Sequence, residues 1–176
     1  MQPTPITQSY RLVETTSIGE VREDVASGQK AFFAGRFFTV GEAISSFAAG
    51  EVHATPSYLT VQLGDAKHIM LSPAYLQYIN HSCSPNCFFD TTNLTVVALR
   101  DIACEEELSF FYPSSEWDMS QPFVCNCGSR QCLGIIQGAK YLSPQQALAY
   151  RLNVYIEGKE TTRDEPTSHK KHRGRL

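Results

Sequence analysis

Residues 78–86 read Tyr-Ile-Asn-His-Ser-Cys-Ser-Pro-Asn and form the most informative stretch of the chain. Two polar residues, Asn80 and His81, directly follow an apolar segment, and Pro85 and Asn86 end the stretch. A buried loop with so many hydrogen-bonding groups requires partners, because unpaired buried polar groups cost free energy. From these residues alone, the partners are either other groups of the loop or a bound ligand, and both interpretations remain open.

A second informative stretch is Cys-Asn-Cys-Gly-Ser-Arg-Gln-Cys-Leu-Gly at residues 125–134. Its three cysteines are close enough to share one tetrahedral zinc ion, and a structural zinc site takes four protein ligands. The alternative is three ordinary thiols. A zinc ion here would be structural, because the segment has little apolar core of its own. The three cysteines are Cys125, Cys127 and Cys132, and the candidates for the fourth ligand are Cys83, Cys87, Cys104 or a histidine.

Length and composition favour one folded domain. The 176 residues (19.6 kDa) are 42% apolar and 11% aromatic, which is enough for a buried core. The net charge of −3 excludes a strongly basic coat for nucleic acid, so nucleic-acid binding is not expected. The apolar runs are too short to span a bilayer, and the first eleven residues lack the pattern of a secretory signal. We therefore expect a cytoplasmic or nuclear protein that is neither secreted nor bound to a membrane.

Charge is unevenly distributed along the chain. Residues 168–176 hold four Lys and Arg residues and no acid, which gives this segment a charge of +4. The remaining 167 residues hold 11 Lys and Arg against 18 Asp and Glu, and their charge is −7. We interpret residues 157–176 as a disordered basic tail, with contact to an acidic partner or to nucleic acid as the alternative.

Short β-prone segments dominate the body of the chain. Residues 57–63 and 67–71 flank the turn signal Gly64-Asp65 and predict a hairpin. Residues 31–40, 94–99 and 107–112 predict further strands. One helix is predicted at residues 143–152, because Ser143 is a suitable N-cap and Pro144 fits the first helical position. These patterns predict a mainly β fold.

Three segments resemble, in the expected order, the signatures of SET-domain protein methyltransferases. Residues 80–86 resemble the Asn-His-Ser-Cys-x-Pro-Asn signature, residues 106–112 resemble a second signature that usually ends in Phe-Asp-Tyr, and residues 125–134 resemble the post-SET zinc motif. The resemblance implies a β-clip-like SET fold of small sheets with a pseudoknot, short helices and a C-terminal zinc-binding segment. We expect an N-terminal segment (1–19), a SET domain (20–113), a linker with the post-SET segment (114–142) and a C-terminal helix (143–156).

The resemblance also implies a chemistry and a set of site residues. It implies S-adenosylmethionine as cofactor, a lysine amine of a protein or peptide as acceptor, Tyr112 as the catalytic residue and Cys83 as the fourth zinc ligand. By the same resemblance, the cofactor-binding residues are Gly28, Lys30, Phe32, Asn80, His81 and Leu133. The residues expected to line the substrate channel are Phe47, Phe111 and Trp117, although Trp117 is equally well interpreted as a cover for the core.

Several positions depart from the family pattern. Gly28-Gln29-Lys30 replaces the usual Gly-x-Gly, Phe111 replaces an acidic residue beside the tyrosine, and Gln77 replaces an arginine. A lysine at position 30 adds a Cβ and a charge where backbone usually approaches the cofactor closely. A second interpretation therefore remains, since fold does not fix function. In it the SET fold is reused as a small-molecule biosynthetic enzyme or as a binding module that does not methylate.

Overall fold

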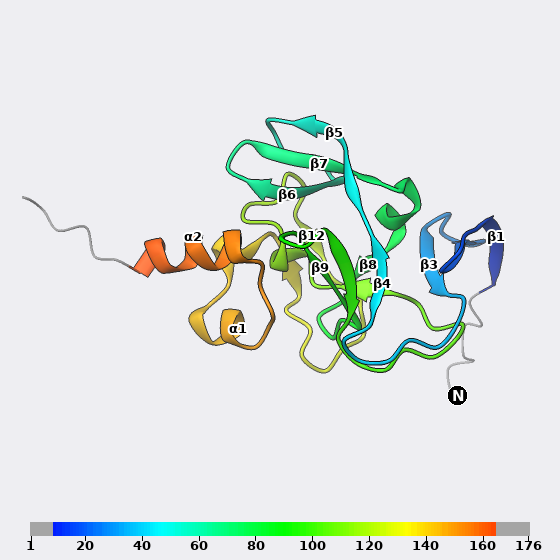
Figure 1. Ribbon diagram of the computed structural model, residues 1–176. Helices are drawn as coiled ribbons and strands as arrows, with labels where there is room; N and C mark the ends of the chain where they lie inside the picture. Colours follow the sequence, from blue (N-terminus) through cyan, green and yellow to red (C-terminus); the bar gives the residue numbers. More distant parts are fainter. Residues whose placement is uncertain (1–8, 165–176) are drawn as a thin grey trace, which may run out of the picture.

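The computed structural model describes residues 9–164 as a mainly β protein (Figure 1). Its strands in this range are β1 (Tyr10–Thr15), β2 (Gly19–Asp24), β3 (Lys30–Ala34), β4 (Ala43–Ser46), β5 (Ala48–His53), β6 (Thr60–Gly64), β7 (Lys67–Ser72), β8 (Asn80–His81), β9 (Cys87–Asp90), β10 (Thr95–Ala98), β11 (Ser109–Phe110), β12 (Phe123–Val124) and β13 (Ile135–Ile136). Its helices are the short 3₁₀ turns η1 (Ala74–Tyr78), η2 (Tyr112–Ser114) and η3 (Ala139–Tyr141), and the α-helices α1 (Pro144–Leu148) and α2 (Val154–Asp164).

The described strands form five small sheets around one main core. Three antiparallel sheets have the orders β1-β2-β3, β4-β10-β9 and β5-β7-β6, and two further pairs are β8-β11 and β12-β13. Figure 1 shows β5-β7-β6 at the top and the β1-β2-β3 sheet at the right of the molecule. The main core contains fully buried side chains from most of these elements, among them Phe32, Ile69, Leu76, Phe89 and Leu108. Within the described residues, no helix is long and apolar enough to cross a bilayer.

Most predicted strands are present but shorter than predicted. The hairpin of β6 and β7 is confirmed at Gly64. The predicted strand at 31–40 ends at Ala34, and Phe38 makes only an isolated bridge to Ile102. The predicted strand at 107–112 pairs only at Ser109–Phe110. Strand β1 lies within the predicted N-terminal segment and pairs with β2.

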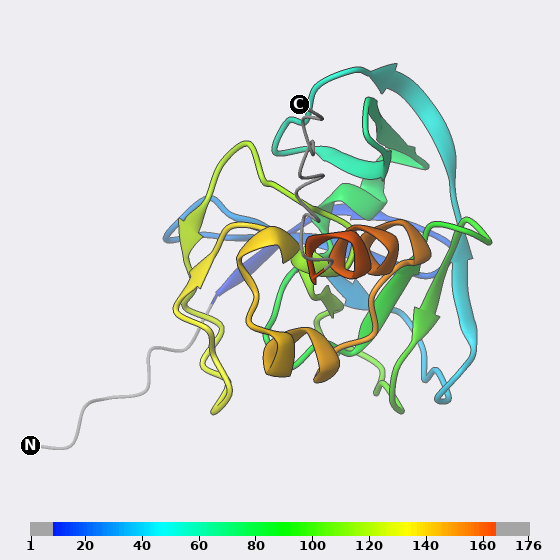
Figure 2. The same ribbon diagram turned by 90° about the vertical axis from the view of Figure 1, so that its left-hand side faces the viewer.

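The C-terminal region contains two helices where one was predicted. Helix α1 begins after Ser143, whose hydroxyl accepts a hydrogen bond from the backbone N–H of Gln146, so the predicted cap is confirmed, but the helix ends at Leu148. The prediction that disorder begins at residue 157 is wrong, because α2 continues to Asp164. Tertiary contacts explain the error: Ile156 is fully buried, so a polar sequence is held as a helix. Figure 2 shows both helices on one side of the body. The predicted tail beyond residue 164 lies outside the described residues.

The pairing of β8 with β11 brings the two signature segments side by side. It is parallel, with Asn80 opposite Ser109 and His81 opposite Phe110. Beyond the strands, Ser82 N–H donates to the carbonyl oxygen of Phe110 at 3.0 Å. Residues 29 positions apart in the sequence thus lie side by side. The threading of one segment through a loop remains a prediction.

The side chain of Asn86 holds the two signature segments together. Its side chain is 1% exposed. Its Nδ2 donates to the Glu107 carbonyl oxygen at 2.8 Å and to a carboxylate oxygen of Glu106 at 3.1 Å, and its Oδ1 accepts from Ser109 N–H at 2.8 Å. One buried amide therefore aligns both signature segments and places Tyr112, which follows β11, next to His81.

Candidate active site and zinc site

Tyr112 and His81 form the centre of the candidate site. The backbone N–H of Tyr112 donates to Nδ1 of His81 at 3.3 Å, and the two rings meet edge-on with centroids 5.2 Å apart. Phe123 closes the group, since its ring lies 5.6 Å from His81 and 6.0 Å from Tyr112. The aromatic ring of Tyr112 is thus held by the zinc-segment side of the protein as well as by β8.

Burial determines the protonation states of both residues. It raises the pKa of Tyr112 to about 12, and the nearby Glu107 carboxylate adds to this effect. Burial lowers the pKa of His81 to about 4. At neutral pH the tyrosine is therefore a phenol and the histidine is an uncharged imidazole. A phenol can orient a reactant by hydrogen bonding, but it is too weakly acidic to act as a phenolate base.

A cavity of about 290 Å³ opens beside Tyr112. It lies between the edge strand β6 with the loop before it, the η1–β8 segment, and the linker at residues 119–123. Its volume is at the lower end of the range of about 300–1,000 Å³ found for small-molecule sites. Its walls include Tyr58, Val61, Ile79, Phe110, Glu116 and Met119.

The three residues expected to line a substrate channel lie outside this cavity, and their role toward a substrate remains a prediction. Phe47 is 5% exposed in the main core, with its ring 5.6 Å from that of Phe89. The ring of Phe111 stacks on Tyr150 at 3.7 Å and 8°, because it points to the opposite side from its neighbour Phe110. Trp117 packs in the cluster under α1 and α2. None of these three residues is among those that line the cavity beside Tyr112.

Three groups meet near Tyr112 and could hold a cationic cofactor. The side-chain N–H₂ of Asn80 donates to the carbonyl oxygen of Lys30 at 2.9 Å and to a carboxylate oxygen of Glu107 at 3.2 Å. Burial raises the pKa of Glu107, although the hydrogen bond from Asn80 acts against the rise. A partly buried carboxylate flanked by a carbonyl and an amide suits a ligand with positive charge.

The remaining predicted cofactor residues fall into two groups. Gly28 has φ +72° at the exposed turn between β2 and β3, and the ammonium of Lys30 lies 5.2 Å from the ring centroid of Tyr78. Leu133 is half-buried, and its N–H donates to Cys83 Sγ at 3.4 Å. Phe32, by contrast, is fully buried in the main core. It has no surface to offer a ligand, so its expected contact with the cofactor is corrected.

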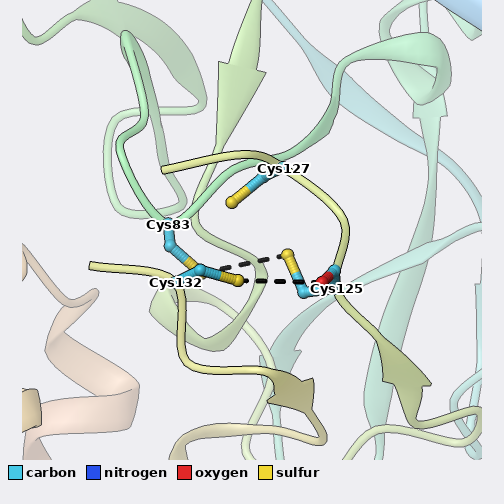
Figure 3. A group of neighbouring side chains, drawn as sticks. All are labelled: Cys83, Cys125, Cys127 and Cys132. Atoms are coloured by element: carbon cyan, nitrogen blue, oxygen red, sulfur yellow. Dashed lines mark hydrogen bonds between the residues drawn. The ribbon is translucent and has the colours of Figure 1, made fainter. Parts of the chain in front are cut away.

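The four predicted cysteines converge in one cluster (Figure 3). Their Sγ atoms all lie within 4.8 Å of one another, and those of Cys83 and Cys125 are 4.0 Å apart. A tetrahedral zinc ion with Zn–S bonds of about 2.3 Å requires S···S separations of about 3.8 Å. The donor set therefore fits a structural zinc ion. The remaining cysteines lie outside the cluster: Cys87 is buried with its thiol bonded to the Ser109 carbonyl oxygen, and Cys104 is exposed.

Local hydrogen bonds prepare the cluster for metal. Burial acts against ionisation of Cys127, but backbone N–H groups and neighbouring thiols lower the pKa of this thiol to about 6. Gly128 has φ +69°, which allows the tight turn between Cys127 and Cys132. The Cys83 carbonyl oxygen accepts from Gln131 Nε2 at 2.7 Å and from the Tyr150 hydroxyl at 3.0 Å. The metal loop is thereby tied to the loop after β8.

Comparison with known proteins agrees with this geometry. The family model described as SET domain matches residues 14–113. The chain belongs to the SET-domain family. The matched range starts before the predicted start at residue 20 and ends at the predicted end.

Named relatives include methyltransferases of different sizes. The chain is 43% identical over 112 residues to methyltransferase flvH of Aspergillus flavus, which covers 60% of this chain and 62% of that protein. It is 39% identical over 67 residues to the H3 lysine-4 specific histone-lysine N-methyltransferase of Aspergillus fumigatus, covering 34% of this chain and 5% of that protein. It is 39% identical over 62 residues to human histone-lysine N-methyltransferase 2B, covering 32% and 2%. The chain therefore spans less than two thirds of the length of these relatives.

Proposed function

We propose that this SET-domain protein is a methyltransferase that uses S-adenosylmethionine to methylate an aliphatic amine, in the first instance a lysine side chain of a protein. The observation that carries the proposal is the position of Tyr112. Tyr112 lines the cavity. It is also close enough to the Glu107 carboxylate for that charge to raise its pKa, and Glu107 is hydrogen-bonded to Asn80. One residue thus joins a polar pocket suited to a cation with a cavity suited to an alkyl chain.

The cofactor, when bound, supplies a methyl group on a positively charged sulfonium. The backbone of Lys30, the amide of Asn80, the carboxylate of Glu107 and the segment at Leu133 would hold it. The neutral phenol of Tyr112 would orient the acceptor amine for in-line attack, which is mainly a matter of alignment. The apolar walls of the cavity would exclude water from the alkyl chain.

A free small-molecule amine is the second candidate acceptor. Two observations favour this candidate. Methyltransferase flvH, whose name specifies no histone, shares 112 aligned residues with this chain, whereas the histone-lysine enzymes share 67 and 62. The cavity is also small. A non-methylating binding module is less well supported, because each of these relatives is named a methyltransferase. A nuclear or cytoplasmic location remains a prediction.

Two measurements test the proposal. Calorimetry with S-adenosylmethionine and its demethylated product should show binding by the full chain. Mass spectrometry should then show the gain of one or more methyl groups on lysine-containing peptides or on free alkylamines. Absence of binding at millimolar cofactor would contradict the methyltransferase proposal and favour the binding module.

A further inference from the structure

Glu116 is a buried carboxyl group in the wall of the cavity beside Tyr112. The residue is 8% exposed. Its backbone N–H donates to the carbonyl oxygen of Tyr112 at 3.1 Å, so the turn that begins with η2 brings both residues to the same cavity. One carboxylate oxygen accepts from the backbone N–H of Gln62 on β6 at 2.9 Å. An ionised carboxylate offers about four acceptor positions, so one neutral donor satisfies it only in part.

The surroundings of Glu116 supply no counter-charge. Among the described residues, the salt bridges do not include Glu116, while neighbouring cations are paired with other acids: Lys140 with Asp118 and Lys159 with Asp65. All other residues that line the cavity are apolar, hydroxyl-bearing or amide-bearing. Within residues 9–164, Glu116 is therefore the one carboxylate or ammonium group that lines the cavity. A buried charge without a partner is costly, and the cost disappears when a cation enters.

A purely structural role does not account for the charge. Two hydrogen bonds link Gln62 to this segment: its backbone N–H donates to the Glu116 carboxylate, and its side-chain oxygen accepts from Trp117 N–H, both at 2.9 Å. This pair attaches the edge strand β6 to the segment after η2. A glutamine at position 116 would accept the same hydrogen bond from Gln62 without the cost of a buried charge. The hydrogen bond that attaches β6 thus requires only an oxygen acceptor at position 116, which a neutral side chain would also supply. The negative charge of the ionised Glu116 carboxylate is therefore available to a ligand.

We propose, on the basis of the function proposed above, that Glu116 is the residue that recognises the acceptor, and that the acceptor binds as an alkylammonium whose positive charge pairs with this carboxylate. The bound ammonium would lose one proton to water before its nitrogen takes the methyl group, and the sulfonium would leave as a neutral thioether. A lysine side chain and a free alkylamine share this chemistry. The apolar walls hold the alkyl chain, and Glu116 provides the charge that discriminates an amine from an alcohol or an amide of similar size.

The ionisation of Glu116 makes this recognition dependent on pH. Burial raises the pKa of Glu116 to about 8, although the Gln62 hydrogen bond acts against the rise. Deprotonation therefore increases between pH 7 and pH 9, while a primary alkylammonium stays charged there, because its pKa is about 10.4 like that of lysine. Binding of an alkylammonium should accordingly strengthen as the pH rises through this interval.

The other titratable groups around Glu116 change little between pH 7 and pH 9. Burial raises the pKa of Tyr112 to about 12, and the pKa of Tyr155, which is bonded to Gln62, is also raised. Burial lowers the pKa of His68, which lies opposite Gln62 on β7. The hydrogen bond from Lys159 lowers the pKa of Asp65 and raises that of Lys159 itself. The remaining titratable group of the cavity lining is Tyr58.

The test is binding of n-butylammonium chloride to the full chain without methyl donor, measured by calorimetry at pH 7 and pH 9. Wild-type protein should bind several-fold more tightly at pH 9 than at pH 7. Glu116→Gln should weaken binding at pH 9 at least tenfold and remove the pH dependence. Glu51→Gln is the matched control, because Glu51 is exposed and is not among the residues that line the cavity. Equal binding by wild type and Glu116→Gln, or no binding by wild type, would overturn the proposal.

A second measurement covers the case in which Glu116→Gln does not fold. The carbon NMR shift of the Glu116 carboxyl in wild-type protein should titrate near pH 8, and saturating n-butylammonium should move that titration to lower pH by at least one unit. An unchanged titration would overturn the proposal without any variant. A lysine-containing peptide is the second ligand: tighter binding than n-butylammonium assigns the acceptor to a protein, and equal or weaker binding assigns it to a free amine.

The outcomes separate this inference from the proposed function. If the protein methylates amines but Glu116→Gln binds n-butylammonium like wild type, the function stands and the role of Glu116 is wrong. If Glu116→Gln loses n-butylammonium binding but no amine is methylated with S-adenosylmethionine present, the recognition site stands and the methyltransferase proposal is wrong.

Discussion

The Nε2 atom of His81 lies 3.3 Å from the Sγ atom of Cys83. The other ring nitrogen, Nδ1, accepts the backbone N–H of Tyr112, so the ring hydrogen is on Nε2 and is directed at the sulfur. His81 therefore joins a proposed zinc ligand to the proposed catalytic tyrosine through a single neutral imidazole. A hydrogen-bond donor that contacts a metal-binding sulfur in this way orients the thiolate and links the metal to its surroundings.

We predict that Cys83→Ser removes the zinc ion and lowers the free energy of unfolding by more than about 4 kcal/mol, a range typical of a lost metal site. Cys83 is fully buried, and it alone connects the β8 loop to the cysteine cluster. Elemental analysis and thermal unfolding measure the two effects. Cys104→Ser is the control, since Cys104 is exposed and outside the cluster, and should keep its zinc content. Full zinc occupancy in Cys83→Ser would contradict the assignment.

Tyr112→Phe should lower the rate of methyl transfer about 10²-fold, the size of effect expected when a positioning contact is lost. The phenol is buried and protonated, so its loss removes a hydrogen bond to the reacting amine and leaves the ring packing with His81 and Phe123 in place. Affinity for the cofactor, measured by calorimetry, should change less than threefold. Tyr141→Phe, at an exposed tyrosine bonded to Asp118, should leave the rate unchanged. A normal rate in Tyr112→Phe would exclude Tyr112 from the chemistry.

The cysteine cluster could be predicted because its residues belong to sequence motifs. Three of the four thiols lie within eight positions, and Cys83 belongs to the same stretch as Asn80. The cavity lining could not be predicted in this way. Glu116 is one of two acids in a polar linker, and its position against Gln62 depends on how β6 packs on the segment after η2. Sequence gives no signal for such a long-range contact.

The errors at Phe111 and α2 have related physical causes. The aromatic run Phe110-Phe111-Tyr112 does not reveal which ring enters the cavity, because strand alternation sends Phe110 to one side and Phe111 to the other. Helix α2 has a polar sequence that predicts disorder in isolation. Tertiary contacts override the local preference: Ile156 is buried, and the side chain of Asn153 donates to the carbonyl oxygens of Phe89 and Ser114.

Asn86→Ala should destabilise the fold by about 2–4 kcal/mol, because it removes three hydrogen bonds and leaves buried backbone groups without partners. The lost bonds are those to the Glu107 carbonyl oxygen, the Glu106 carboxylate and the Ser109 N–H. Urea unfolding measures the change. Asn126→Ala is the control, since Asn126 is exposed within the cysteine segment and should change stability by less than about 0.5 kcal/mol. Equal stability of the two variants would show that Asn86 does not align the signature segments.

The buried charge of Glu116 should also appear in the stability of the ligand-free protein. The pKa of Glu116 is about 8 in the folded protein against an ordinary value of 4.5, so the folded state keeps a proton that the unfolded state loses as the pH rises from about 4.5 to 8. Glu116 therefore reduces stability progressively across this interval. Glu116→Gln has no proton to lose, so its free energy of unfolding relative to wild type should increase by about 2–5 kcal/mol between pH 5 and pH 9. Urea unfolding at both pH values measures the difference. The contributions of other titrating groups cancel because they are the same in wild type and variant. The control Glu51→Gln should show no such increase. A constant difference between wild type and Glu116→Gln would mean that the carboxyl is ionised at neutral pH with a partner of its own.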